Sequence, residues 1–202
     1  GSKRAMLQNG LGGLLDREAA GARRFVDLFA GSGAVAIYVA RKFPVTVLAF
    51  DLQLYSTVLT AAVVTRQAKL NWEAVWQNWH KAAAAQFSAR KIPTAEILTH
   101  TIVADLRSWC DDQGDLPVTK AYGGHYFSPR QSVWIDAFRS NLPSRDPTTT
   151  VAVAALIQAA SQCAAAPGHT AQPFQPTPTA KRFIEEAWSR DIRAATGKKP
   201  VS

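Results

Sequence analysis

Two glycines and an acidic residue are the residues whose types and spacing could bind a ligand. Gly31 and Gly33 lie in "DLFAGSGAVA", between a strand-forming run and a helix-forming run. Glycine permits a tight turn and lets backbone N–H groups approach a ligand at the positive end of the following helix. Asp51 follows Gly33 by eighteen residues, at the end of a second apolar run. Its carboxylate could accept hydrogen bonds from ribose hydroxyls, so the spacing predicts a ligand that contains a nucleoside.

The segments around these residues predict alternating strands and helices. We expect strands at residues 24–30 and 45–50, and helices at residues 6–20, 33–43 and 53–69. This order indicates a parallel α/β sheet, in which the carboxyl ends of neighbouring strands share one edge. Gly31, Gly33 and Asp51 would then lie together at that edge.

The remainder of the chain is predicted to be mostly helical. Helices are expected at residues 71–90, 129–141, 148–165 and 179–196, with Pro178 in the first turn of the last one and a proline-punctuated loop at 167–178. Residues 95–109 fit either a helix or a strand. Trp72, Trp76 and Trp79 recur at helical spacing, which favours core packing over a base-stacking surface.

Together these elements predict an α/β fold with a Rossmann-like sheet, incomplete and accompanied by a large helical insertion. Two or three strands can be identified, where a complete sheet of this kind has seven. We expect a cofactor-binding part at residues 1–70 and a mostly helical region at residues 71–202, which could also form one compact domain with the first.

The composition sets further bounds. The 202 residues carry a net charge of +8, which favours a polyanionic partner, although scattered surface charge would give the same value. Cys110 and Cys163 form no C-x-x-C pair, the four histidines are far apart, and no metal site is expected. Neither a membrane-length apolar run nor a signal-peptide pattern is visible, so we expect a cytoplasmic protein.

Two types of nucleoside cofactor fit the glycine pattern. Gly31, Gly33 and Ala36 match G-x-G-x-x-A, the pattern of dinucleotide-binding proteins. The same stretch matches F-x-G-x-G, with Asp27 inside the strand, and is followed by "AFD" at residues 49–51. This second combination is more specific, and it resembles the S-adenosylmethionine motif of class I methyltransferases.

The resemblance implies a set of cofactor-binding residues. The backbone of Phe29, Ala30, Gly31, Ser32 and Gly33 would hold the methionine moiety, with Asp27 in the strand beside it. Asp51 would bind the ribose, and Leu52 would flank the adenine. Asp105 would lie near that adenine only if residues 97–104 form a strand.

The N-terminal segment resembles one particular group within the class I methyltransferases. "GSKRAMLQNGLGGLL" precedes the glycine motif, and its first three residues resemble the G-x-K segment of the alpha group of DNA adenine methyltransferases, the restriction-modification type of bacteria and phages. The resemblance implies that Lys3 and its neighbours close over S-adenosyl-L-methionine. It also implies double-stranded DNA as the partner and methyl transfer to the exocyclic amino group of adenine.

A second stretch, "YGGHYFSPRQSVWIDAFRSNL", is similar to a segment that helps hold DNA around an extruded base in some members. Lys120, Tyr122, Tyr126 and Arg130 are therefore candidate DNA-binding residues, in a loop at residues 120–130 that Gly123 and Gly124 allow to bend. Their rings and charges suit base stacking and phosphate contact. The alternative is a loop whose aromatic residues anchor it to the core. Asp136 is interpreted as a surface charge or as the partner of a helix cap.

The family's catalytic D-P-P-Y sequence is absent. In the family, its carboxylate and a backbone carbonyl accept the amino hydrogens of adenine while its tyrosine stacks on the base. Here threonines follow Asp146-Pro147 in "SRDPTTT", and "NLPS" from Asn141 ends a predicted helix. No catalytic residue is therefore assigned. The catalytic half could be missing from a fragment, carried by a second polypeptide, or lost in a non-catalytic cofactor- or DNA-binding relative.

Three rival classes remain open. A nicotinamide-dependent oxidoreductase would bind NAD in place of S-adenosylmethionine. A purely nucleic-acid-binding protein would bind DNA whether or not the cofactor is present. A class I methyltransferase that acts on RNA or on a small molecule would share the glycine motif and Asp51.

Overall fold

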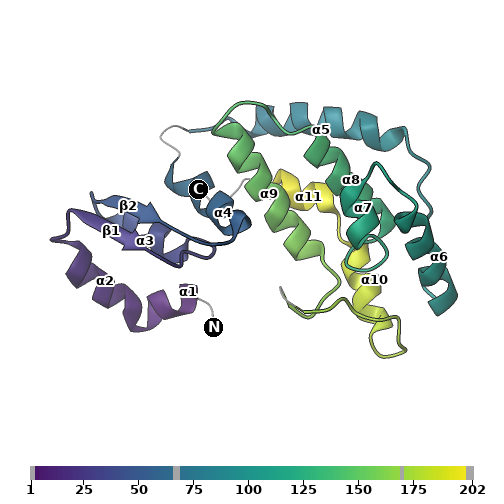
Figure 1. The fold of residues 1–202 in the computed structure, drawn as a ribbon, viewed down its shortest axis with the longest axis horizontal. Coiled ribbons are helices and arrows are strands. Elements are labelled where there is room, and N and C mark those ends of the chain that lie inside the picture. Colours follow the sequence, from purple (N-terminus) through teal and green to yellow (C-terminus); the bar gives the residue numbers. More distant parts are fainter. Residues whose placement is uncertain (1–2, 66–68, 169–170, 199–202) are drawn as a thin grey trace. The chain divides into compact units, whose positions relative to one another are not determined.

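The computed structural model describes residues 3–65, 69–168 and 171–198 of the chain (Figure 1). Contacts divide these residues into two units. The first unit comprises the described residues of Gly1–Leu70 and Ser144–Ala154, and the second comprises those of Asn71–Pro143 and Ala155–Lys199. The structure defines each unit by itself.

The first unit contains a small parallel sheet. Strand β1 (Arg24–Asp27) pairs with β2 (Thr46–Ala49), so that Arg24 lies opposite Thr46 and Asp27 opposite Ala49. Helix α3 (Ala34–Lys42) connects the strands and α4 (Leu54–Val64) follows β2. The strand–helix–strand–helix order predicted from the sequence is thus confirmed.

One face of this sheet is covered and the other is open. Leu15 and Ala19 of the helix preceding β1 pack with Val35 and Val39 of α3, and partly buried apolar residues that include Phe25 and Val47 pack against this cluster. Val26 and Leu48 come next in each strand and are 45% and 36% exposed. Because successive strand residues point to opposite faces, Val26 and Leu48 lie on the second face, which the described residues of the first unit leave exposed.

The N-terminal helix predicted at residues 6–20 is interrupted. The segment consists of α1 (Lys3–Met6), a π-helical turn η1 (Leu7–Leu11) and α2 (Gly12–Ala19). Asn9 and Gly10 leave the helical region, and Gly10 has a φ of 107°, which glycine adopts without the steric cost that a side chain brings. The short turn that carries Lys3 is therefore separate from α2.

The second unit is built from helices around α8. The elements are α5 (Trp72–Ser88), α6 (His100–Asp111), α7 (Pro117–Tyr122), α8 (Pro129–Ser140), the later part of α9 (Thr148–Cys163), α10 (Lys181–Ser189) and α11 (Ile192–Gly197). Every residue of α8 from Pro129 to Phe138 except Arg130 is buried. Ser128 and Gln131 form a capping box that starts this helix.

The tryptophans of α5 are confirmed as core residues. Trp72 and Trp79 are 6% and 2% exposed. Trp79 donates a hydrogen bond to the carbonyl of Phe138 over 2.9 Å, and the Trp76 ring lies 5.5 Å from that of Phe138. These rings therefore fix α5 against α8.

One open alternative is decided and one expectation is corrected. Residues 95–109 fitted either a helix or a strand, and the helix is observed: α6 begins after Thr99, whose side chain accepts a hydrogen bond from the Ile102 backbone N–H, so Asp105 lies on a helix. The last predicted helix is two helices, because Arg190 has extended backbone and Asp191 caps α11. Pro178 lies before the first turn of α10, and α7 was not predicted at all.

The described residues are thus mostly helical, with one two-stranded parallel sheet. The Rossmann-like class stays a prediction, since further strands of such a sheet are absent from the described part of the chain. Among the described residues, the helices are all too short or too polar to cross a membrane.

Candidate functional site

A tight turn follows β1, and Gly31 and Gly33 allow it. Their φ values are 55° and 76°, in the left-handed region that favours glycine. The Ala30 N–H donates to the carbonyl of Phe50, and the Gly33 N–H donates to that of Ala30, each over 2.9 Å. The turn is thereby closed and joined to the end of β2.

Gly33 is also fixed by its neighbour on α4. A Cβ atom at Gly33 would lie 2.5 Å from Oγ1 of Thr60, a contact too short for any real side chain. Thr60 is 4% exposed, and its hydroxyl has no partner among the described residues. Thr60 was not among the site residues predicted from the sequence. Ser56 and Thr60 are four residues apart in a mostly apolar helix, so they share one face of α4, and this spacing was the available signal.

Asp51 binds the glycine turn from the end of β2. The Gly31 N–H donates to its Oδ2 over 2.7 Å, and the Gln53 N–H donates to its Oδ1 over 2.9 Å. These backbone donors, first Gln53 and then Gly31, lower the pKa of Asp51, and the positive charge of Lys3 adds to the effect. The carboxylate is therefore ionised at neutral pH. Gln53 is a second residue that sequence reasoning missed.

Asp27 supports the turn from the end of β1. Its Oδ1 accepts a hydrogen bond of 3.2 Å from the Phe29 N–H. Its Oδ2 is buried and has no hydrogen-bond partner among the described residues. An unpaired buried carboxylate oxygen costs free energy, so this atom has the capacity to accept a donor from a ligand or from water.

Lys3 reaches the same turn. Its Nζ donates a hydrogen bond to the carbonyl of Phe29 and lies 4.0 Å from the position that a Cβ atom on Gly31 would occupy. The structure thus brings Lys3 together with the predicted cofactor residues. Gly1 and Ser2 of the G-x-K segment lie outside the described residues.

Exposed apolar side chains surround the carboxyl ends of β1 and β2. Phe29 is 75% exposed and Leu52 is 99% exposed. The polar side chain of Ser32, in the turn between them in sequence, is exposed as well. Phe50, Leu54 and Tyr55 add further exposed area. Ala30, by contrast, is 1% exposed, so its side chain lies beneath the turn and only its backbone lies in the loop.

The second predicted segment, residues 120–130, divides into an anchored part and an exposed part. Phe127 is 8% exposed, and Tyr126 donates a hydrogen bond of 3.3 Å to the carbonyl of Ala171. Lys120 and Tyr122 are exposed at the end of α7. Arg130 is exposed at the start of α8, with its guanidinium 5.0 Å from the centre of the Phe87 ring. The core-anchor interpretation holds for Phe127 and Tyr126.

Asp136 is not a surface charge. It is 1% exposed, and its carboxylate accepts hydrogen bonds from the backbone N–H groups of Val118 and Thr119, at 3.0 and 2.8 Å, and from the Thr119 hydroxyl at 2.9 Å. It therefore caps α7, as the alternative interpretation predicted. The N-cap position of α7 is held by Leu116, which offers no side-chain acceptor.

The two near matches to the catalytic sequence are loop residues. Asp146-Pro147 lies between α8 and α9, and Asp146 Oδ1 accepts a hydrogen bond of 2.8 Å from the Thr150 hydroxyl. Asn141 is the C-cap of α8. Neither residue lies at the end of a strand.

The first unit thus places a glycine turn and an ionised carboxylate at the carboxyl ends of parallel strands, the edge where α/β proteins bind nucleoside ligands. Residues 1–94 match the family model of the D12 class N6 adenine-specific DNA methyltransferases. The resemblance to adenine methyltransferases is therefore confirmed for this stretch, which includes the whole turn and Asp51. No curated protein and no solved structure gives a significant match.

Proposed function

We propose that the first unit is the S-adenosylmethionine-binding part of a DNA adenine methyltransferase, which transfers a methyl group to the exocyclic amino group of adenine. The observation that carries this proposal is the hydrogen bond between Gly31 and Asp51 inside the stretch that matches the family. A restriction-modification role and a cytoplasmic location belong to the same proposal.

The residues at this edge fit the cofactor by their chemistry. Each carboxylate oxygen of Asp51 has lone-pair capacity beyond its one backbone hydrogen bond, so it can accept ribose hydroxyls. The exposed side chain of Leu52 can flank an adenine. The Lys3 ammonium lies over the turn and can pair with an amino-acid carboxylate, while Oδ2 of Asp27 lacks a donor. When bound, S-adenosylmethionine supplies the methyl group from its sulfonium.

DNA contact is assigned to the second unit. The charges of Lys120 and Arg130 suit phosphates, and the exposed ring of Tyr122 suits base stacking. Tyr126 lies 5.9 Å from Tyr122 in an edge-to-face arrangement and would position that ring. These roles support double-stranded DNA as the substrate.

These 202 residues contain no D-P-P-Y, so methyl transfer requires that sequence from a further segment of a longer chain or from a second polypeptide. We propose that the part that supplies it docks on the open face of the sheet. Val26 and Leu48 are exposed there, and Leu28 and Phe50 continue the apolar surface past the strand ends at 63% and 53% exposure. Parallel sheets are normally covered on both faces, and a two-stranded sheet leaves both outer edges unpaired.

The absence of D-P-P-Y from these 202 residues also favours a second candidate function. Without a catalytic carboxylate for the adenine amino group, the chain could serve as a non-catalytic subunit that binds cofactor or DNA in a split methyltransferase. Both candidates share the cofactor site, and methylation by the chain together with a D-P-P-Y polypeptide distinguishes them.

Calorimetric titration of the 202-residue chain with S-adenosylmethionine tests the proposal. We expect micromolar binding that Asp51→Ala abolishes. Asp16→Ala is the matched control, because Asp16 also accepts two hydrogen bonds in this unit but takes them from the side chains of Tyr38 and Lys42, away from the turn. A folded chain that does not bind, or an Asp51→Ala variant that binds normally, would contradict the proposal. Binding of NAD instead would favour an oxidoreductase.

A further inference from the structure

The first unit carries a cluster of cations at the end opposite Asp51, which we call the basic end. It consists of Arg17, Arg23, Arg24, Arg41 and Lys42. Arg24 begins β1, and Arg41 and Lys42 end α3. Because a crossover helix runs back along the strands that it connects, the last turn of α3 returns to the strands' amino ends. Figure 1 shows the last turn of α2 and the start of β1 at this same end.

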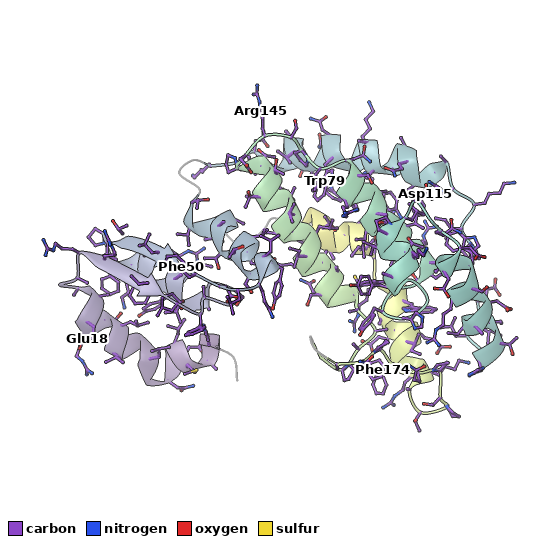
Figure 2. All side chains as sticks on the ribbon, viewed as in Figure 1. Glu18, Phe50, Trp79, Asp115, Arg145 and Phe174 are labelled. Carbon is purple, nitrogen blue, oxygen red and sulfur yellow. The ribbon has the colours of Figure 1, made fainter. Side chains whose placement is uncertain are left out.

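Specific contacts bring these segments together. Lys42 forms an ion pair with Asp16 of α2 at 2.5 Å, and Tyr38 donates to the same carboxylate over 2.7 Å. Arg24 lies opposite Thr46, where β2 begins. The ends of α2 and α3 and the starts of both strands therefore form one surface. Figure 2 labels Glu18 beside α2 at the outer side of the unit and Phe50, which follows β2, away from it nearer the middle.

The positive charge of this surface is mostly uncompensated. Arg17, Arg23, Arg24 and Arg41 are exposed, and none forms an ion pair with a described residue. The Asp16 carboxylate is already paired with Lys42, which leaves Glu18 as the nearby acid in the sequence. Cations in a last helical turn are explained by the helix dipole, but Arg23 and Arg24 precede and begin a strand.

We propose that the basic end binds the phosphate backbone of duplex DNA, separately from the cofactor edge. Guanidinium groups suit this role because they bind phosphate oxygens in pairs. About 10 Å of strand separates Arg24 from Asp27, so a phosphate at the basic end leaves the glycine turn free. The inference rests on the proposed function for its choice of DNA as the polyanion. It adds a sequence-independent contact that holds the duplex to the first unit.

The test compares two triple variants that remove the same charge. One is Arg23→Gln, Arg24→Gln and Arg41→Gln. The control is Lys81→Gln, Lys91→Gln and Arg139→Gln, which changes exposed cations of the second unit that form no ion pair with described residues. Fluorescence anisotropy of a labelled duplex measures the dissociation constant between about 50 and 200 mM salt. Circular dichroism confirms that each variant is folded.

The slope of log affinity against log salt is negative, and each lost phosphate contact reduces its magnitude by about 0.9. We therefore expect the magnitude to fall by about 2 to 3 for the arginine variant and to change little for the control. Equal effects of both triples would overturn the inference, because they would show a response to net charge alone. No DNA binding by the wild-type chain, or tighter binding to polyglutamate than to DNA, would also overturn it. Calorimetry with S-adenosylmethionine on the same samples tests the proposed function independently.

Discussion

The backbone N–H of Gly31 donates a hydrogen bond of 2.7 Å to Oδ2 of Asp51, across twenty residues of sequence. This bond ties the turn after β1 to the end of β2. The same carboxylate also accepts the Gln53 N–H, so one side chain organises both loops of the candidate site. Loss of Asp51 should therefore alter the turn itself as well as any contact with a ligand.

Acidification should release the Gly31 turn. The backbone donors Gln53 and Gly31 lower the pKa of Asp51 in the folded chain below its ordinary value of 3.8. The stability from these bonds is present above that value and is lost as the pH falls through the lower folded pKa. An NMR pH titration that follows the Asp51 carboxyl and the Gly31 amide shift measures the pKa of Asp51 in the folded chain. A midpoint at or above 3.8 would contradict the geometry.

Gly33→Ala should destabilise the first unit. A left-handed φ costs an alanine about 1–2 kcal/mol, and the new methyl would overlap Oγ1 of Thr60 as well. Gly13→Ala is the matched control, since Gly13 lies within α2 with no atom within 4 Å of a Cβ and should be neutral or slightly stabilising. Urea denaturation measures the free energy of unfolding of both variants. Equal stabilities of the two variants would show that the turn does not require glycine at residue 33.

The two cysteines should be inert in the folded chain. Burial raises the pKa of Cys110 to about 12 and that of Cys163 to about 11. Because the thiolate is the reactive form, little of either thiol reacts at pH 8. We expect iodoacetamide to alkylate both cysteines only after the chain is unfolded, and mass spectrometry of the treated protein measures this. Rapid modification of the native chain would show that these positions are open.

Asp136→Ala should destabilise the second unit by about 3 kcal/mol or more. The change leaves two backbone N–H groups and the Thr119 hydroxyl without their acceptor, and each unpaired buried group costs about 1–3 kcal/mol. Asp136→Asn keeps one acceptor oxygen and should lose about half as much stability. Urea denaturation compares them. If the alanine variant is as stable as wild type, the cap does not hold α7.

Tyr122→Ala should weaken DNA binding more than Tyr126→Phe does. The ring of Tyr122 is 48% exposed and can stack on a base, and such stacking contributes about 1–3 kcal/mol. The Tyr126 hydroxyl, by contrast, donates its hydrogen bond within the protein, to the carbonyl of Ala171. Anisotropy with a labelled duplex compares the dissociation constants. The assignment of DNA contact to Tyr122 fails if its loss leaves the affinity unchanged.

The geometry of the candidate site could be predicted from the sequence because its determinants are local. Gly31 and Gly33 follow a strand-forming run directly, and Asp51 ends the next one, so parallel pairing alone brings them together. The start of α8 is equally local, since Ser128 and Gln131 form a capping box three residues apart.

The features that were missed or left open depend on partners distant in the sequence or on a balance of propensities. Nothing near Asp136 in the sequence shows that α7 needs its carboxylate. Residues 95–109 are rich in β-branched residues, yet the cap by Thr99 and the burial of Val103 and Leu106 favour a helix. The interruption at Gly10 was signalled by the glycines of "NGLGG", whose weak helix propensity the apolar periodicity concealed.

In the proposed function, the turn at Gly31 and the carboxylate of Asp51 bind S-adenosylmethionine. Amide NMR spectra of the isotope-labelled chain, recorded during titration with S-adenosylmethionine, test it most directly. We expect saturable shifts of the Gly31, Gly33 and Leu52 amides, with the amides of α6 unchanged. Spectra that do not change, or shifts confined to residues outside the first unit, would contradict it.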